Sequence, residues 1–314
     1  MNGAQEQGTA VLAGSSKEAY IGSVLFFKHL ILGIVILLIL IPTALAVIFW
    51  IQTRGLEQQI AGMKNQMIQA TQVTAQEDEG LAPEQTVLSE PEMPVYTALY
   101  PELYAEPAEY GTEDIEHSVY LTFDDGPSDR TPEILEILTE YGIKATFFVV
   151  GAADEQGLQR MRDISAAGHT LAIHSYSHDY RKIYASVEAY LEDFDQMYRQ
   201  IVEATGCKPQ IFRFPGGSIN GYNGGVYREI IAEMTRRGFV YFDWNLTNGD
   251  AASSQIQPAE ILAANALKGV DTARRAIILM HDSSGKTTTV EALPAIIEGY
   301  QKAGYTFAPL TAQT

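Results

Sequence analysis

The chain has 314 residues, enough for one large domain or two average ones, and 46% of them are hydrophobic, so it can bury a core. It carries 39 acidic and 21 basic residues and a formal net charge of -18. No basic patch or stripe is visible, which argues against a nucleic-acid partner because phosphates would not be neutralised. Cys207 is the only cysteine, so an intrachain disulfide is excluded.

The N-terminal region contains a predicted membrane anchor. Residues 1–28 read as a short tail, and the chain is apolar and uncharged from Leu30 to Ile51. At a helical rise of about 1.5 Å per residue this run can cross a bilayer, and Lys28 and Trp50 flank it as interfacial anchors would. We therefore predict a single transmembrane signal-anchor over residues 29–51.

Two other interpretations of the apolar run stay open. One is a buried core helix, which would need protein on every side. The other is a signal peptide cleaved near Ala44-Leu45-Ala46, which resembles a small-residue cleavage site. Basic residues both precede and follow the run, so the positive-inside rule does not give its orientation.

Residues 52–116 are predicted to form a stalk. From Arg54 to about Ala75, apolar side chains recur at alternating spacings of four and three, the pattern of a short coiled-coil seam: Leu56, Ile60, Met63, Met67 and Ala70. This seam would pair two copies as a homodimer, and a polar helix without a partner is the alternative. The stretch from Glu77 to Glu116 has no Lys or Arg and reads as an acidic, Pro-containing spacer. Its aromatic and leucine side chains between Tyr96 and Tyr104 are available to pack onto the domain that follows.

Residues 117–314 are predicted to form an α/β domain, because apolar runs alternate with amphipathic stretches. The predicted strands are Val119–Phe123, Ala145–Val150, Thr170–Ile173, Ile211–Phe214, Phe239–Trp244, Ala276–Met280 and Tyr305–Leu310. The predicted helices are one that begins at Thr131 as N-cap and ends at Gly142, then Leu158–Ala167, Val187–Thr205, Val226–Arg237, Ala259–Leu267 and Val290–Ala303. This alternation implies a parallel sheet, and about seven units favour a closed or nearly closed barrel over an open sheet.

Polar residues follow several of these strands, at the end where active sites of parallel barrels assemble. Asp124 and Asp125 end the first strand, so one carboxylate can bind a cation while the other acts as a base, although Asp-Asp-Gly-Pro is also an ordinary turn sequence. His174 and His178 are spaced so that two imidazoles can converge on one ion, although surface or core-packed histidines show the same spacing. With Asp125 they would leave coordination positions open, which indicates a catalytic rather than a structural metal.

Two further residues stand at strand ends. Arg213 follows a strand-like run, and a permanent charge there is costly unless paired, so we expect a carboxylate partner; an unpaired surface Arg is the alternative. The run Ile277 to Met280 delivers His281 and Asp282 to the same face. A histidine in this position is often structural, but here other catalytic groups accompany it.

Five segments together resemble a known family: Thr122 to Gly126, His174 to His178, Arg213 to Gly216, Asn245 to Asp250 and Leu279 to Asp282. In their order and spacing, the chain from about Val119 to Pro309 resembles the polysaccharide deacetylases of carbohydrate esterase family 4. The resemblance implies a distorted (β/α) barrel. It also implies a divalent metal, usually zinc and sometimes cobalt, and the removal of acetyl groups from N-acetylated or O-acetylated sugars.

The resemblance also assigns roles to the polar residues. It implies that Asp125, His174 and His178 bind the metal. Asp124 would be the general base that takes a proton from the attacking water, and His281 would protonate the departing sugar amine.

Supporting roles follow from the same resemblance. Arg213 would orient the base, the backbone N–H of Gly216 would stabilise the oxyanion, and Asp250 would support His281, with Asp243 as second choice. Three residues would line the substrate pocket: Leu279, Trp244 and Pro215. The chain departs from the family where Gly216 replaces an expected tyrosine and Ala251 an expected tryptophan, which leaves the shape of the substrate groove open.

Together, anchor, spacer and resemblance predict a membrane-anchored, metal-dependent hydrolase with its catalytic domain outside the cell. It would act on carbon–nitrogen bonds other than peptide bonds, at N-acetylglucosamine of peptidoglycan. An O-deacetylase of xylan or another exopolysaccharide is the alternative reaction. A wall-binding module without turnover, and a stalk that assembles partners at the membrane, are alternatives of other classes.

Overall fold

The computed structural model describes residues 29, 31–32, 93–106, 117–253 and 255–314. Contacts group the chain into two units, Met1–Glu90 and Pro91–Thr314, and all helices and strands named below belong to the second. The predicted tail, membrane span and coiled-coil seam lie outside the described residues, except for residues 29, 31 and 32. Within the described part of the chain, no helix combines the length and apolarity that crossing a membrane requires.

Eight parallel strands form one sheet in the described domain. They are β1 (Ser118–Gly126), β2 (Thr146–Val150), β3 (Thr170–Ser175), β4 (Ile211–Phe212), β5 (Val240–Tyr241), β6 (Leu246–Thr247), β7 (Arg275–His281) and β8 (Thr306–Phe307). Their order is β5-β4-β3-β2-β1-β7-β6, and β8 pairs with the first residues of β1. Seven match the predicted runs, whereas β6 was not predicted because two residues are too few for a readable alternation.

The sheet curls but stays open, so the prediction of a closed or nearly closed barrel is corrected to a curled half-barrel. Among the described strands, β5 pairs only with β4 and β6 only with β7. Each of these end strands has two residues, too few to build a ladder across the gap.

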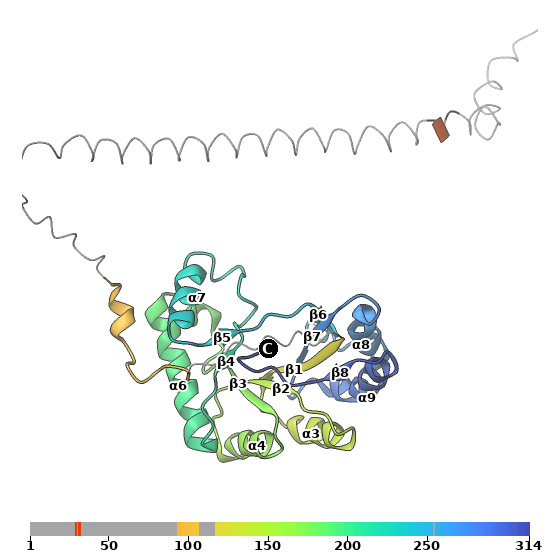
Figure 1. Cartoon of the computed structure of the whole chain (residues 1–314), viewed down its shortest axis with the longest axis horizontal. Coiled ribbons are helices and arrows are strands. Elements are labelled where there is room, and N and C mark those ends of the chain that lie inside the picture. The colour runs from red at the N-terminus through yellow and green to blue at the C-terminus, as the bar shows by residue number, and fades with distance from the viewer. Residues whose placement is uncertain (1–28, 30, 33–92, 107–116, 254) are drawn as a thin grey trace, which may run out of the picture. The chain divides into compact units, whose positions relative to one another are not determined.

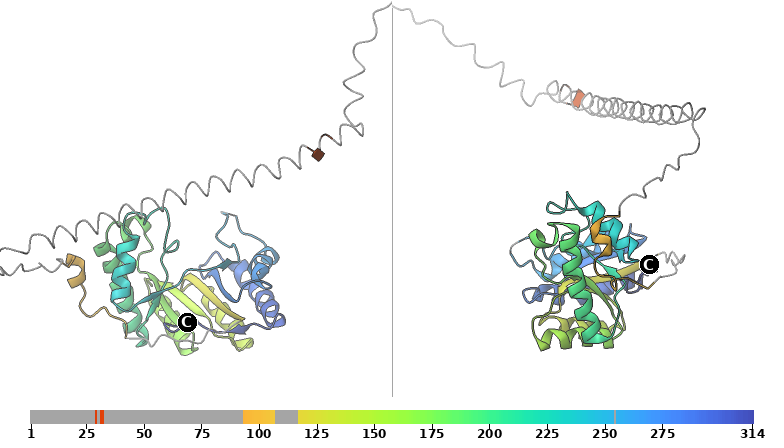
Figure 2. Two further views of the ribbon diagram at one scale, coloured as in Figure 1. Left: turned by 45° about the horizontal axis from the view of Figure 1, so that its top comes forward. Right: turned by 90° about the vertical axis from the view of Figure 1, so that its left-hand side faces the viewer.

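The helices surround the curled sheet (Figure 1, Figure 2). They are α3 (Thr131–Glu140), α4 (Glu155–Ala166), α5 (Tyr180–Ile183), α6 (Val187–Thr205), α7 (Tyr227–Arg236), α8 (Ala259–Ala266) and α9 (Thr287–Lys302), with short 3-10 helices at η1 (Val95–Ala98) and η2 (Leu267–Gly269). All but α5 lie close to predicted ranges. The longest, α6, begins where Ser186 Oγ accepts from the Ala189 N–H and ends at Gly206 in the left-handed conformation.

The start of α3 differs from its prediction as an N-cap at Thr131. Thr131 is the first helical residue, and Arg130 precedes it without a capping side-chain hydrogen bond. The Thr131 hydroxyl instead accepts from the Ser128 N–H at 2.8 Å and donates to Asp282 at 2.6 Å. Gly142, with a φ of 66°, follows the helix in the left-handed conformation as predicted. The Thr131 hydroxyl, which the local sequence predicted to cap the helix, therefore binds the carboxylate of Asp282, 151 residues away in the chain.

Residues 93–106, here called the docked arm, pack onto the domain. Leu103 is buried, and the rings of Tyr96 and Tyr100 pack against the core. The fully buried guanidinium of Arg237 donates to the carbonyls of Tyr96, Leu99, Tyr100 and Leu103 at 2.7 to 3.3 Å. This part of the predicted spacer thus belongs to the compact unit, which extends N-terminal of residue 117.

Candidate metal and catalytic site

Asp125, His174 and His178 converge at the carboxyl edge of the sheet. Asp125 lies near the end of β1, His174 lies on β3, and His178 lies in the loop before α5. Asp125 Oδ1 is 3.5 Å from Nε2 of His174 and 3.2 Å from Nε2 of His178. Their candidate ligand atoms all lie within 4.8 Å of one another, so one cation can reach all three.

The hydrogen bonding of both histidines suits a metal. The Nδ1 of His174 lies 2.9 Å from the Arg213 carbonyl, which can only accept, so Nδ1 carries the proton and Nε2 keeps a free lone pair. Burial lowers the pKa of His174 to about 3, so the imidazole is neutral at pH 7. Nε2 of His178 is buried without a hydrogen-bond partner in the described structure. A cation would satisfy this nitrogen, and two nitrogens with one carboxylate suit zinc or cobalt.

Two residues of this cluster, Asp125 and His178, have unusual backbone conformations. Asp125 has a φ of 68° and His178 a φ of 51°, in the left-handed region that non-glycine residues rarely adopt. Such conformations persist only where surrounding contacts enforce them, and they concentrate at functional sites.

Asp124 and Arg213 form a buried ion pair beside the cluster. Asp124 is 2% exposed and Arg213 is fully buried, and Nη1 of Arg213 lies 2.8 Å from Oδ1 of Asp124. Burial raises the pKa of Asp124, while the charge and hydrogen bond of Arg213 oppose that rise. The guanidinium also donates to the Thr122 hydroxyl at 2.7 Å and to the Phe242 carbonyl at 2.9 Å. The carboxylate partner expected for Arg213 is therefore Asp124.

His281 is held by Asp250 rather than by Asp243. Its Nδ1 lies 2.7 Å from Oδ1 of Asp250, and its backbone N–H donates to Oδ2 at 2.9 Å. Thr289 donates to the same Oδ2 at 2.8 Å. Asp243 instead accepts from the backbone N–H of Ser218 at 2.9 Å and from its hydroxyl. Burial lowers the pKa of His281, but the hydrogen bond and charge of Asp250 outweigh it, so the pKa is raised.

Asp124 and His281 lie opposite each other on the neighbouring strands β1 and β7. The register of β1 and β7 places Asp124 directly opposite His281. The negative charges of Asp124 and Asp125 add to the rise in the pKa of His281. One edge of the sheet thus combines a candidate cation site, a buried carboxylate and an imidazole whose pKa is raised.

Gly216 lies against Tyr180, whose ring contacts His178. It is exposed and has a φ of 77°, and a Cβ at this position would stand 2.7 Å from the ring of Tyr180. The Tyr180 ring packs edge-on against His178, with centroids 5.3 Å apart, and contacts Tyr222 at 5.2 Å. The close approach of this backbone to the site therefore depends on the absence of a side chain at residue 216.

The three predicted pocket residues lie on elements that border the site. Leu279 is 9% exposed on β7, two residues before His281. Pro215 is buried and its carbonyl accepts from the Tyr184 hydroxyl at 2.8 Å. The half-buried Trp244 has its ring centroid 5.7 Å from the Arg213 guanidinium. Their contact with an acetyl group stays a prediction.

Sequence reasoning missed residues that support the site, chiefly Asp193, Tyr180 and Thr289. Asp193 stands three residues after the buried Tyr190 and one before the buried Phe194. A carboxylate on the apolar face of a helix was the signal that could have revealed it. Tyr180 and Thr289 carry no comparable signal.

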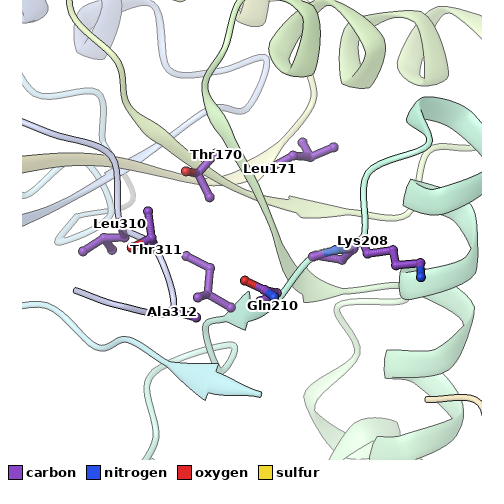
Figure 3. Close-up of a pocket in the computed structure, with 9 residues that line it drawn as sticks. Thr170, Leu171, Lys208, Gln210, Leu310, Thr311 and Ala312 are labelled. Carbon is purple, nitrogen blue, oxygen red and sulfur yellow. The ribbon is translucent and has the colours of Figure 1, made fainter. Parts of the chain in front are cut away.

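A pocket at the opposite edge of the sheet contains none of the site residues (Figure 3). It is lined by Thr170 and Ile211, the first residues of β3 and β4, and by the C-terminal residues Leu310 to Ala312. Because the strands are parallel, this amino edge lies away from the edge that carries the cation site.

Comparison with known proteins gives consistent matches. Residues 111–235 match the family model for polysaccharide deacetylase. A peptidoglycan-N-acetylglucosamine deacetylase of Bacillus cereus is 33% identical over 191 residues, 60% of this chain and 67% of that protein. A bifunctional xylanase/deacetylase of Pseudobutyrivibrio xylanivorans is 33% identical over 195 residues, 62% of this chain and 30% of that protein. The catalytic domain of a peptidoglycan N-acetylglucosamine deacetylase from Eubacterium rectale superposes with a TM-score of 0.60 at 37% identity, covering 68% of this chain and 96% of that one.

Proposed function

Because the chain belongs to the polysaccharide deacetylase family, whose members are hydrolases acting on acetylated sugars, we propose that it is a metal-dependent N-deacetylase. Its proposed substrate is the N-acetylglucosamine of peptidoglycan. The names of the Bacillus cereus and Eubacterium rectale relatives support this choice.

One observation carries the proposal: the candidate cation site, the buried carboxylate of Asp124 and the imidazole of His281 meet at one edge of the sheet. A zinc or cobalt ion held by Asp125, His174 and His178 would polarise the acetyl carbonyl and acidify a water molecule. Asp124, whose carboxylate pairs with Arg213 at 2.8 Å, is the proposed acceptor for the proton of the attacking water.

His281 provides the complementary acid. An amine leaves an acyl carbon readily only when its nitrogen is protonated, so an amide substrate needs a proton donor on the leaving side. The hydrogen bond and charge of Asp250 raise the pKa of His281, which favours the protonated imidazole that an acid requires. The exposed backbone of Gly216, beside the ligand His178, is the proposed donor to the developing oxyanion.

An O-deacetylase of xylan or another exopolysaccharide is the second candidate, favoured by the similarity to the xylanase/deacetylase. A wall-binding module without turnover is the less favoured candidate, because the three candidate metal ligands lie within reach of one cation and the proposed base and acid are each paired, with Arg213 and Asp250.

We further propose that residues 29–51 anchor the enzyme in the cell membrane, with the catalytic domain outside the cell and the stalk pairing two copies. The support is the uncharged apolar run from Leu30 to Ile51, together with the seam and acidic spacer that follow.

The test is acetate release by the zinc-loaded full chain from peptidoglycan, chitooligosaccharides and acetylated xylan. We expect release from the N-acetylated substrates and its loss in Asp124→Asn. Asp195→Asn, on α6 with its carboxylate paired to Arg199, is the matched control and should remain active. Release from acetylated xylan alone would favour the O-deacetylase. No release by the wild type, with Asp124→Asn indistinguishable from it, would refute an enzymatic role.

A further inference from the structure

Asp193 lies on α6, outside the reacting groups, yet its carboxylate binds the loop that carries His178. The side chain is 3% exposed. Oδ2 accepts from the Ser175 hydroxyl at 2.6 Å and the Tyr176 N–H at 2.7 Å, and Oδ1 accepts from the Ser177 N–H at 2.8 Å. The Ser175 hydroxyl in turn accepts from the His178 N–H at 2.9 Å. One carboxylate thus binds three consecutive residues directly and a fourth, His178, through the Ser175 hydroxyl.

The loop needs this support because of the backbone at His178. A left-handed residue with a side chain is strained and persists only when its neighbours enforce it. At His178, with a φ of 51°, the N–H is bound by Ser175, whose own hydroxyl proton is bound by Asp193. This hydrogen-bond chain sets the turn that aims the imidazole at Asp125.

The two ligand histidines are therefore positioned by different elements. His174 is oriented through its ring, by the carbonyl of Arg213 at 2.9 Å. His178 is oriented through its backbone, by Ser175 and Asp193. Nε2 of His178 has no hydrogen-bond partner in the described structure and its ring packs edge-on against Tyr180, so the hydrogen bonds that orient this residue are those of the loop backbone.

A charged carboxylate suits this position better than an amide. All three groups that face Asp193 are donors, and both of its oxygens accept. Asparagine has the same size but presents one oxygen and one NH2 group. The NH2 group would oppose a loop N–H, so at least one of the three hydrogen bonds would be lost.

We infer that Asp193 is a positioning residue for the metal: it presets the His174–His178 loop so that His178 meets the ion without rearrangement. The inference rests on the metal centre of the proposed function. Loss of such an outer hydrogen-bond partner typically lowers metal affinity about 10- to 100-fold, and we expect a loss of that size here.

The test is titration of the metal-free full chain with Co²⁺, followed by calorimetry and by the visible spectrum of the bound ion. Asp193→Asn and Ser175→Ala should each weaken binding about 10- to 100-fold and alter the spectrum, because the ligand geometry changes. Asp195→Asn is the matched control, since Asp195 is 7% exposed on the same helix but pairs with Arg199 at 2.8 Å. Its affinity and spectrum should equal those of the wild type.

Wild-type affinity and spectrum in both loop variants would overturn the inference and leave the deacetylase proposal standing. The inference would also fail if these variants only lower the melting temperature of the metal-free chain. If Asp193→Asn does not fold, the Co²⁺ affinity of Ser175→Ala tests the inference, because this variant removes one hydroxyl and leaves the Asp193 carboxylate in place. A wild-type chain that binds no Co²⁺ would overturn both the inference and the proposed metal dependence.

Discussion

His281 illustrates how burial and pairing compete at a single residue. Burial alone would favour the neutral imidazole, but Asp250 contributes a 2.7 Å hydrogen bond and a negative charge, and the pKa rises. Because the imidazole must be protonated to act as an acid, the raised pKa extends activity toward alkaline pH.

The Asp250→Asn variant should therefore lose activity at lower pH than the wild type. The substitution removes the charge that raises the pKa of His281, so the alkaline limb of the kcat/KM profile should move toward acid pH. The measurement is acetate release from a chitooligosaccharide across pH 5 to 10. As a control, Asp243→Asn changes a carboxylate that binds Ser218 instead, and it should leave this limb in place. An unshifted limb in Asp250→Asn would contradict the assigned pairing.

Arg213 shows the cost of an unbalanced buried charge. Its replacement by Met would keep much of the volume but leave Asp124, 2% exposed, without its cation. Breaking a buried pair in this way typically costs about 3–5 kcal/mol. We expect a loss of that order in urea unfolding, together with loss of acetate release because the base becomes protonated. Arg213→Lys should lose less stability, since it keeps the charge; equal stability of Arg213→Met and wild type would argue against the pair.

At the scale of elements, the docked arm is attached to the domain by hydrogen bonds from Arg237 to its backbone carbonyls. Arg237 is fully buried, with Glu233 at 2.7 Å, and its remaining donors bind four arm carbonyls. A guanidinium can satisfy this many acceptors because it carries five N–H groups in a fixed plane. The arm is thereby tied to α7 through its backbone.

We predict that Arg237→Met releases the arm while the sheet remains folded. Amide hydrogen exchange of residues 95–104 should become faster by about 10-fold or more, since each 1.4 kcal/mol of lost stabilisation is a factor of ten. Arg228→Met is the control, because Arg228 lies on α7, directly after which Arg237 stands, and its guanidinium lies over the neighbouring Tyr227 ring. Unchanged exchange in the arm would show that Leu103 and the tyrosine rings suffice to hold it.

For the molecule as a whole, the metal should couple activity to stability. A ligand that binds only the folded state stabilises it by about 2.7 kcal/mol at 100 times its Kd. The melting temperature should therefore rise with zinc, and a chelator should abolish acetate release until zinc is restored. His178→Ala should weaken the thermal response, whereas His169→Ala, outside the ligand set, should retain it. A melting temperature independent of zinc in the wild type would contradict a metal bound at this site.

The sequence predicted those parts of the fold and site that are indicated by a few consecutive residues. Apolar runs of four to six residues identified β1, β2, β3 and β7, and polar groups at their ends identified Asp124, Asp125, His174, His178 and His281. The two-residue strand β6 and the four-residue helix α5 were not predicted, because such short segments show no periodicity.

By itself, the sequence determined which chemical groups stand at strand ends, because strand periodicity and side-chain chemistry are both local properties. Only the tertiary structure decided which groups meet. In the folded chain His281 pairs with Asp250 and not with Asp243, and the Thr131 hydroxyl donates to Asp282 and does not cap the helix. The sheet is open. The physical reason is that these outcomes depend on strand register and on competition among donors and acceptors far apart in the chain. The hydrogen bond between Asp193 on α6 and Ser175 in the loop of His178 is another such long-range contact.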